Sequence, residues 1–319
     1  MMATAAAGVA ASLTALTGRD FLSSADFSAE ETAALLELAS QLKSGERRID
    51  LGNRVLGLIF TKASTRTRVS FSVAMTRLGG QTVDLNPSVT QLGRGEPLQD
   101  TARVLSRYCD ALAVRTYAQQ EIVDYAHWST VPVINALTDL EHPCQALADF
   151  LTMREVHGDL AGQTLAYIGD GNNVAHSLML CGALLGVNVR IGCPEGFEPL
   201  SGILDQARSL AQQGASIEVL SDPVEAVRGA QAVYTDVWAS MGQEEEQHER
   251  EQAFAAFCLD QELMGHAAAD AIVLHCLPAH RGEEITAEVM EGASSRIFDQ
   301  AENRLHAQQA LLAAVLGGL

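Results

Sequence analysis

Two sets of short apolar runs, separated by helical patterns, constrain the fold more than any other feature of this sequence. The runs are rich in Val, Ile and Leu with little polar alternation, which is typical of parallel strands buried on both faces. The runs of the first half are 55–60, 81–85, 111–116 and 131–137, and those of the second half are 164–170, 187–192, 215–220, 232–238 and 271–278. A chain of 319 residues suits two domains. The pattern therefore predicts an α/β protein of two domains, each a parallel β-sheet flanked by helices.

Helical patterns flank these runs. Ser28 and Glu31 fit a capping box that opens a helix over about 28–42. A helix over about 144–158 is the expected hinge between the domains, and the C-terminal helix is expected over about 303–316. The alanine-rich start of the chain is expected to be a frayed extension, since it has no basic segment of the kind that opens a leader peptide.

Charge and cysteine usage narrow the class of protein. The 21 Lys and Arg residues against 40 Asp and Glu residues give a net charge of -19, which disfavours nucleic acid as a partner. The six cysteines are scattered without a CxxC pair, as expected of free thiols in a reducing compartment, so we expect a cytoplasmic protein. No apolar run approaches the length of a membrane span, so no membrane partner is expected.

The segment Ser64-Thr65-Arg66-Thr67-Arg68 follows the first apolar run and opens an amphipathic helical pattern. It places hydroxyls, backbone N–H groups and guanidinium groups at a helix start, where the macrodipole also favours an anion. Arginine adds forked hydrogen bonds to phosphate oxygens. The glycines of a Walker loop are missing. The segment therefore predicts a site for a small phosphorylated substrate, against the alternative of a helix cap followed by surface arginines.

Two further features of the first half are typical of a catalytic site. His142 precedes Pro143, Cys144 and Gln145 at a predicted helix start, where its imidazole could donate to a developing oxyanion or only cap the helix. No matching His, Cys or Asp spacing indicates a metal. Arg115 ends a predicted strand, at the edge where ligands of α/β proteins usually bind.

The second half contributes polar residues after three predicted strands. Gly169-Asp170-Gly171 offers only part of a dinucleotide-binding pattern, and the nearby Asn173 could instead bind a substrate carboxylate. Asp236 lies four residues before Ser240. His275-Cys276-Leu277-Pro278 ends the last run. With no recognisable histidine-plus-Asn/Asp arrangement, a polar contact to substrate is a better interpretation of Cys276 than a nucleophile.

Together these motifs resemble those of the ornithine carbamoyltransferase family, in the family's order and from about Gly18 onward. The motifs are Ser64-Thr65-Arg66-Thr67-Arg68, His142-Pro143-Cys144-Gln145, Asp236-x-x-x-Ser240-Met241-Gly242, His275-Cys276-Leu277-Pro278 and Ala301-Glu302-Asn303-Arg304. The first two are shared with aspartate carbamoyltransferases, whereas the D-x-x-x-S-M-G and H-C-L-P motifs point to ornithine as the acceptor.

The resemblance implies an aspartate/ornithine carbamoyltransferase-like fold in which each domain binds one of the two substrates. Residues 1–151, completed by a C-terminal helix over 305–319, would bind carbamoyl phosphate, and residues 152–304 would bind L-ornithine. The reaction would give L-citrulline and phosphate, in arginine biosynthesis, with no metal or organic cofactor. Members of the family commonly form homotrimers or multiples of trimers with each site at a subunit boundary.

Matching positions imply the site residues. The catalytic residues would be Arg115, His142, Asp236 and Cys276. Carbamoyl phosphate would be bound by Ser64, Thr65, Arg66, Thr67, Arg115, His142, Pro143, Cys144, Gln145, Cys276, Leu277 and Arg304, with Gln91 reaching a neighbouring subunit's site. Ornithine would be bound by Asn173, Asp236, Ser240 and Met241. The Leu277–Pro278 bond would be cis, and Thr61 departs from the family's usual residue at a position outside these contacts.

Other functions remain open at this point. A carbamoyltransferase for putrescine or N-acetylornithine is the nearest alternative, and Ser240 with Met241 argues against it. A nicotinamide-dependent dehydrogenase built on Gly169-x-Gly171 would leave the arginine cluster unexplained. A non-catalytic protein that binds phosphate metabolites would bind ligand without turnover.

Overall fold

The computed structural model describes residues 2–86, 95–238 and 247–319. By its internal contacts the chain divides into two compact units, Met1–Ala148 with Asn303–Leu319, and Asp149–Glu302. Each unit contains one parallel sheet, as the apolar runs predict. The predicted boundaries of the substrate-binding domains, 151/152 and 304/305, concern which ligand each part binds and stay a prediction.

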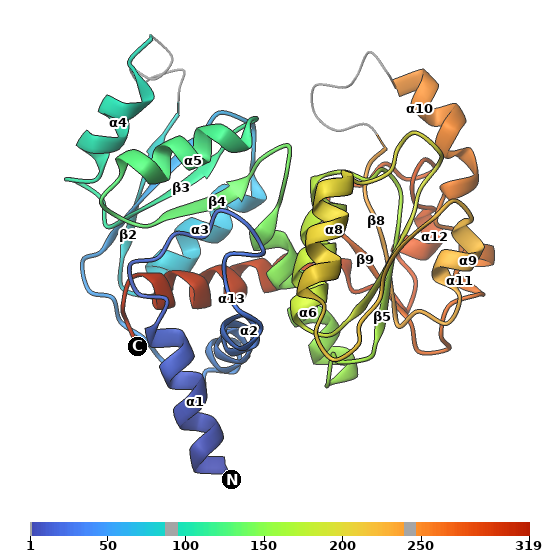
Figure 1. Ribbon diagram of the computed structural model, residues 1–319, viewed down its shortest axis with the longest axis horizontal. Helices are drawn as coiled ribbons and strands as arrows, with labels where there is room; N and C mark the ends of the chain where they lie inside the picture. The colour runs from blue at the N-terminus through green and yellow to red at the C-terminus, as the bar shows by residue number, and fades with distance from the viewer. Residues whose placement is uncertain (1, 87–94, 239–246) are drawn as a thin grey trace. The chain divides into compact units, whose positions relative to one another are not determined.

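The first unit is built on a four-stranded sheet of order β2-β1-β3-β4, in which every pair of neighbours is parallel. Figure 1 shows α4 and α5 on one side of this sheet and α3 and α13 on the other. Its strands are β1 (Val55–Phe60), β2 (Gln81–Leu85), β3 (Ala111–Arg115) and β4 (Val133–Leu137). Its helices are α1 (Met2–Thr14), α2 (Ala29–Ser44), α3 (Arg66–Arg77), α4 (Leu98–Leu105) and α5 (Gln119–Trp128), together with most of α13 (Ile297–Val315).

The second unit is built on a five-stranded parallel sheet of order β7-β6-β5-β8-β9. Its strands are β5 (Thr164–Ile168), β6 (Asn188–Gly192), β7 (Ile217–Leu220), β8 (Ala232–Thr235) and β9 (Ile272–His275). Its helices are α7 (Asn173–Leu184), α8 (Ser201–Leu210), α9 (Pro223–Val227), α10 (Gln247–Phe254), α11 (Gln261–Met264) and α12 (Ala287–Met290), with the 3-10 helix η3 (Ala255–Phe257). Helix α6 (Pro143–His157) contains the point where the first unit gives way to the second.

The strand orders create a switch point in each sheet. In the first unit β1 is followed in the chain by β2 on one side and by β3 on the other. In the second unit β5 is followed by β6 on one side and later by β8 on the other. The connections that follow two neighbouring strands, β1 and β3 or β5 and β8, run to opposite faces of the sheet. A crevice therefore forms outside the carboxyl ends of these strands, where ligands of α/β sheets bind. The residues that follow β1, β3, β5 and β8 are thus placed where binding is expected.

Burial explains why the strands lack polar alternation. All five residues of β3 and all five of β5 are buried, because helices cover both faces of each sheet. The predicted runs extend beyond several strands. In particular β8 ends at Thr235 and β9 at His275, so Asp236 and Cys276 are the first residues after their strands.

The predicted capping box is confirmed. The Ser28 hydroxyl accepts the backbone N–H of Glu31 over 3.2 Å, and the Glu31 carboxylate accepts the N–H of Ser28 over 2.8 Å. Such a cap stabilises a helix by about 1 kcal/mol.

Two expectations about the chain ends are wrong. The alanine-rich start forms helix α1 rather than a frayed extension, because alanine has the highest helix propensity and Leu13 and Leu16 are fully buried. The C-terminal helix begins at Ile297 rather than near Asn303, and Ile297 is itself fully buried. Among the described residues no helix combines the length and the apolar character that a membrane crossing requires. All six cysteines are free thiols.

Candidate active site

The first candidate site lies at the switch point of the first sheet. Helix α3 begins at Arg66, directly after the turn that follows β1, and the side chain of Thr65 at the N-cap accepts no hydrogen bond from the helix. The amides of the first turn are therefore not capped by that side chain, and they attract an anion. Arg66 is exposed and forms no ion pair with any described residue. Arg68 differs, because its guanidinium forms an ion pair with Asp84 and so has a structural role.

Thr67 is fixed from the far end of the chain. Its hydroxyl accepts a hydrogen bond of 2.7 Å from Nη2 of Arg304 in α13. Both side chains are buried, with exposed fractions of 1% and 3%. The predicted anion-binding helix start therefore includes a second, buried guanidinium.

Arg115 ends β3 beside the end of β1, where Phe60 pairs with it in the sheet. The carbonyl oxygen of Arg115 accepts hydrogen bonds from the backbone N–H of Thr61 over 2.9 Å and from its hydroxyl over 3.1 Å. The same hydroxyl lies 3.1 Å from that of Thr116. Thr61 thus holds the turn after β1 against the end of β3, a positioning role that was not assigned to it from the sequence.

His142 lies just before α6, after β4, and is buried. Burial lowers the pKa of its imidazole well below the usual value, and the charges of Arg304 and Arg115 lower this pKa further. The imidazole is therefore neutral at neutral pH and can donate one ring N–H without adding charge. Such a group suits an oxygen atom that becomes negative during a reaction.

The rest of the predicted motif at α6 is buried as well. Pro143 is the first residue of the helix, and the side chain of Gln145 is almost fully buried. The Cys144 thiol donates to the carbonyl of Asn135 over 3.4 Å, and burial raises the pKa of this thiol to about 12. Cys144 is therefore a protonated packing residue rather than a nucleophile.

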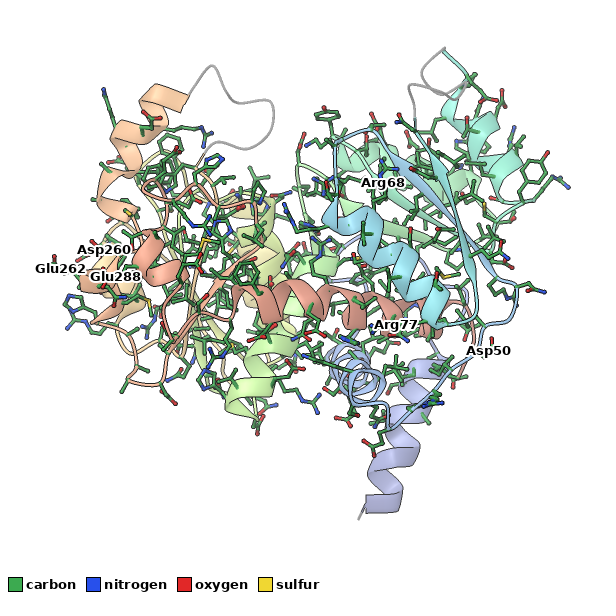
Figure 2. All side chains as sticks on the ribbon, turned by 180° about the vertical axis from the view of Figure 1, so that it is seen from behind. Asp50, Arg68, Arg77, Asp260, Glu262 and Glu288 are labelled. Carbon is green, nitrogen blue, oxygen red and sulfur yellow. The ribbon has the colours of Figure 1, made fainter. Side chains whose placement is uncertain are left out.

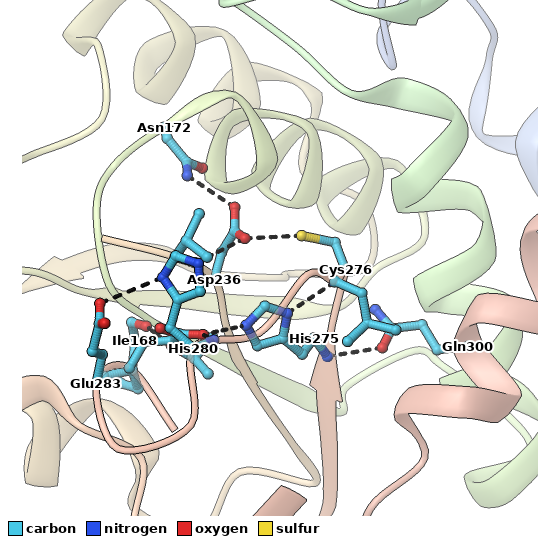
Figure 3. A network of polar contacts seen from close by, with 12 residues as sticks. Ile168, Asn172, Asp236, His275, Cys276, His280, Glu283 and Gln300 are labelled. Carbon is cyan, nitrogen blue, oxygen red and sulfur yellow. Dashed lines mark hydrogen bonds and ion pairs between the residues drawn. The ribbon is translucent and has the colours of Figure 1, made fainter. Parts of the chain in front are cut away.

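The second candidate site lies at the switch point of the second sheet. Figure 3 shows the carboxylate of Asp236, directly after β8, between Asn172 and Cys276. The amide nitrogen of Asn172 donates to Oδ2 of Asp236 over 3.1 Å, and the thiol of Cys276 donates to Oδ1 over 3.0 Å. The backbone N–H of Val237 also donates to Oδ1, over 2.8 Å. These donors fix a single orientation for a carboxylate at the carboxyl edge of the sheet.

The side chain of Asn172 is itself fixed by hydrogen bonds to its oxygen atom. Its side-chain oxygen caps α7 by accepting the N–H groups of Val174 over 2.9 Å and Ala175 over 3.2 Å. The hydroxyl of Tyr167 donates to the same oxygen over 3.3 Å. The amide nitrogen must therefore point away from the helix, toward Asp236.

The segment after β9 is shaped by a buried histidine. One ring nitrogen of His275, Nδ1, accepts the backbone N–H of Leu277 over 2.9 Å, so the other nitrogen carries the proton and donates to Glu284 over 3.0 Å. Leu277 has a φ of 59°, in the left-handed region that a branched side chain seldom adopts. The predicted cis bond between Leu277 and Pro278 is confirmed. His275 thus supports the backbone beside Cys276.

Comparisons with known proteins match both halves of the chain. Residues 19–155 match the family model described as aspartate/ornithine carbamoyltransferase, carbamoyl-P binding domain, and residues 161–315 match the corresponding Asp/Orn binding domain. The chain belongs to the aspartate/ornithine carbamoyltransferase family. The family resemblance and the fold class inferred from the sequence are therefore confirmed.

Members of this carbamoyltransferase family resemble the chain over its whole length. The ornithine carbamoyltransferase of Parasynechococcus marenigrum is 85% identical over 318 residues, which cover 100% of both chains. That of Prochlorococcus marinus strain MIT 9313 is 78% identical, with 98% of each chain covered. The solved structure of ornithine carbamoyltransferase from Pyrococcus furiosus is 50% identical, with a TM-score of 0.91 over 95% of this chain and 99% of that one.

The partial dinucleotide pattern has a different role in this carbamoyltransferase fold. A Cβ atom at Gly171 would lie 2.2 Å from the backbone nitrogen of Pro199, so the glycine permits close packing of two loops. Asp170 is paired with Arg250 over 2.8 Å. The loop is thus occupied by protein contacts, which argues against a nicotinamide cofactor on this turn.

Three predicted site residues lie outside the described part of the chain, namely Gln91, Ser240 and Met241. Asn173 is the first residue of α7 and is half-buried. Asn172 was missed from the sequence, although an Asn directly before a helix is a frequent N-cap and could have been recognised as one.

Asp236, His275 and Cys276 have possible metal-ligand atoms within 4.8 Å of one another. Both ring nitrogens of His275 already have hydrogen-bond partners, so this residue is not available as a metal ligand.

Proposed function

We propose that this protein transfers the carbamoyl group of carbamoyl phosphate to the side-chain amine of L-ornithine, giving L-citrulline and phosphate. The observation that carries the proposal is the 85% identity, over the full length of both chains, to a protein named ornithine carbamoyltransferase. The two candidate sites supply the matching chemistry, an anion-binding helix start in one unit and an oriented carboxylate in the other.

In the proposed reaction the helix start of α3 binds the phosphate group. Arg66 adds a forked hydrogen-bond donor, and the uncapped amides of the first turn add further donors. The set proposed to bind carbamoyl phosphate is Ser64, Thr65, Arg66, Thr67, Arg115, His142, Pro143, Cys144, Gln145, Cys276, Leu277 and Arg304, with Gln91 acting in a neighbouring subunit. Departure of phosphate is favoured because the positive charge at this helix start stabilises the leaving group.

Stabilisation of the carbonyl oxygen is assigned to Arg115, His142 and Thr67. Negative charge develops on that oxygen as the tetrahedral intermediate forms, and donors that are already fixed stabilise it without reorganising. The neutral imidazole of His142 suits this role, because its burial keeps it unprotonated. Loss of one such donor typically costs about 3 kcal/mol of transition-state stabilisation.

Recognition of the acceptor is assigned to Asp236, Asn173, Ser240 and Met241. The ornithine amine resembles that of lysine, whose pKa is about 10.4, so it arrives mostly protonated. The fixed carboxylate of Asp236 attracts the ammonium group and orients it beside the Cys276 thiol. The ammonium group first loses one proton to solvent. The nitrogen then attacks the carbamoyl carbon, the bond from that carbon to the phosphate oxygen breaks, and the departing phosphate takes up the nitrogen's second proton.

We propose a homotrimer, or a multiple of trimers, as the working assembly. Val69 and Val73 on α3 and Val83 on the edge strand β2 are exposed by 55%, 36% and 45%. Exposed apolar side chains on a helix and an adjacent strand edge favour burial against another chain. A cytoplasmic location is proposed as well, since six free cysteines suit a reducing compartment.

The proposal is tested by a citrulline assay with carbamoyl phosphate and a panel of ornithine, putrescine, N-acetylornithine and aspartate. We expect turnover with ornithine and little with the other acceptors. Turnover only with aspartate would contradict the acceptor but leave carbamoyl transfer intact. Preferential turnover with putrescine would show that the acceptor site does not require the α-carboxylate of ornithine.

A further inference from the structure

A cavity of about 550 Å³ lies in the first unit, away from the candidate active site. It is formed where α2 and α3 end and where the loop before β1 passes α13. Figure 2 shows Arg77 and Asp50 near one end of α3, whereas Arg68 lies near the other. The twelve residues of α3 span roughly 18 Å at 1.5 Å per residue, so the cavity is well separated from the helix start. It is lined by Leu42, Gly45, Arg47, Arg48, Ile49, Asp50, Thr76, Arg77, Gly79 and Gln309.

The lining of this cavity includes three arginines, Arg47, Arg48 and Arg77. None of their guanidinium groups forms a hydrogen bond or ion pair with any residue that the structure describes. Nearby arginines behave differently, since Arg54 pairs with Asp110 and Arg68 pairs with Asp84. In a chain with 40 acidic residues and 21 basic ones, acidic partners are abundant. Three guanidinium groups left free around one cavity therefore indicate a site for an anion.

The wall of the cavity is held in place by backbone contacts. The N–H of Arg47 donates to the carbonyl of Gln41 over 3.1 Å, and that of Leu51 donates to Leu78 over 2.7 Å. The Asp50 side chain accepts the N–H of Gly52 over 2.8 Å. The loop that carries Arg47 and Arg48 is thus tied to the ends of both helices, which lowers the entropy cost of binding.

We propose that this cavity binds a small molecule that carries a phosphate or diphosphate group. Phosphate oxygens would contact the guanidinium groups of Arg47, Arg48 and Arg77. The volume lies within the range of pockets for small organic ligands and exceeds what a single phosphate fills. The site is independent of carbamoyl transfer, because no residue proposed for that reaction lines it.

The test uses inorganic pyrophosphate as the probe, titrated into the full-length protein by calorimetry at constant ionic strength. We expect two sites per chain, one at the start of α3 and one in the cavity. The double variant Arg48→Ala/Arg77→Ala should lose the cavity site, with affinity there falling at least about tenfold. The variant Arg66→Ala should lose the other site and retain the cavity site. The matched control Arg107→Ala/Arg228→Ala removes two exposed arginines that also have no ion pair with a described residue, and it should retain both sites.

Adenosine diphosphate serves as a second probe, since it carries a diphosphate group on a larger molecule. It should also bind the cavity, and the double variant Arg48→Ala/Arg77→Ala should weaken its binding as it weakens that of pyrophosphate. Turnover of the Arg48→Ala/Arg77→Ala variant in the citrulline assay should stay unchanged when no probe is present. A single pyrophosphate site that disappears in Arg66→Ala would overturn the proposal, because the arginines would then only balance the carbonyl ends of α2 and α3.

Discussion

Nη2 of Arg304 donates a hydrogen bond of 2.7 Å to the hydroxyl of Thr67, although 237 positions separate the two residues. Thr67 lies in the first turn of α3, and Arg304 lies in α13 near the end of the chain. The contact gives the C-terminal helix a direct role in the anion-binding helix start. The charge of Arg304 is also one cause of the low pKa of His142.

Replacing Thr67 by valine should weaken both folding and phosphate binding. Thr67→Val keeps the shape of the side chain but removes one acceptor of Arg304, and a buried hydrogen bond to a charged group contributes about 1.5–3 kcal/mol. We expect the free energy of unfolding in urea to fall by about that amount and the KM for carbamoyl phosphate to rise about tenfold. Thr67→Ser retains the hydroxyl and serves as the control. Equal effects of both substitutions would mean that the hydroxyl contact is unimportant.

Arg66→Ala should raise the KM for carbamoyl phosphate by about tenfold or more, since a charge-assisted contact to phosphate is lost. Stability should hardly change, because Arg66 is exposed and has no ion pair with a described residue. Arg107→Ala removes another exposed arginine of the same unit and should leave the KM unchanged. Normal saturation of Arg66→Ala by carbamoyl phosphate would show that the helix start binds something else.

Asn172 should act on the reaction through Asp236. Asn172→Asp keeps an acceptor for the cap of α7 but places a second carboxylate about where the amide donated to Asp236. Like charges at this distance repel, so we expect kcat/KM for ornithine to fall at least about tenfold and its pH dependence to shift upward. Asn172→Ser caps the helix without adding charge and should lose less activity. If the two variants were equally impaired with unshifted pH profiles, Asn172 would have only a structural role.

Cys276→Ser should impair the use of ornithine without removing a covalent intermediate, because none is expected to form. Serine can still donate to Oδ1 of Asp236, whereas Cys276→Ala cannot, so the alanine variant should have the higher KM for ornithine. Intact-protein mass spectrometry of the wild type during turnover with carbamoyl phosphate is the direct check. A carbamoyl adduct on Cys276 would establish nucleophilic catalysis instead.

The buried neutral state of His142 should appear in the pH dependence of stability. Its pKa is lowered in the folded protein by burial and by Arg304 and Arg115, whereas in the unfolded chain it is about 6.5. As the pH falls below about 6.5 the unfolded chain binds a proton that the folded protein does not, so stability decreases. Below about pH 6.5, His142→Gln should reduce the dependence of the unfolding free energy on pH by up to about 1.4 kcal/mol per pH unit. An unchanged pH dependence of stability would mean that His142 takes up its proton at the same pH in the folded and the unfolded protein.

Activity gives an independent check on the same residue. Because His142 is already neutral, kcat/KM for ornithine should rise with pH as the substrate amine loses its proton, with no inflection from His142 near pH 6.5. An inflection near that pH that disappears in His142→Gln would contradict the neutral-donor role.

The sequence predicted the elements of the fold because their signals are local. The run Val55–Phe60 has the bounds that the structure shows, since buried parallel strands need a continuous apolar stretch. The run Gln81–Leu85 also has its predicted bounds, although β2 is a largely exposed edge strand. The capping box at Ser28 depends on residues three positions apart. The start of the chain was misjudged, because the propensity of alanine for helix outweighs the absence of charged or amphipathic patterning there.

In the candidate site, too, some features follow from the local sequence and others only from packing. By itself, the sequence determined that hydroxyls and arginines begin a helix after the first strand and that Asp236 and Cys276 lie toward the ends of later apolar runs. Only the tertiary structure decided that Arg68 is used in an ion pair, that Asn172 orients Asp236 from 64 positions away, and that Arg304 reaches Thr67. Helix caps and strand runs follow from neighbours along the chain. Strand order, burial and the distances between remote side chains follow from packing, which alone sets the charge state of His142.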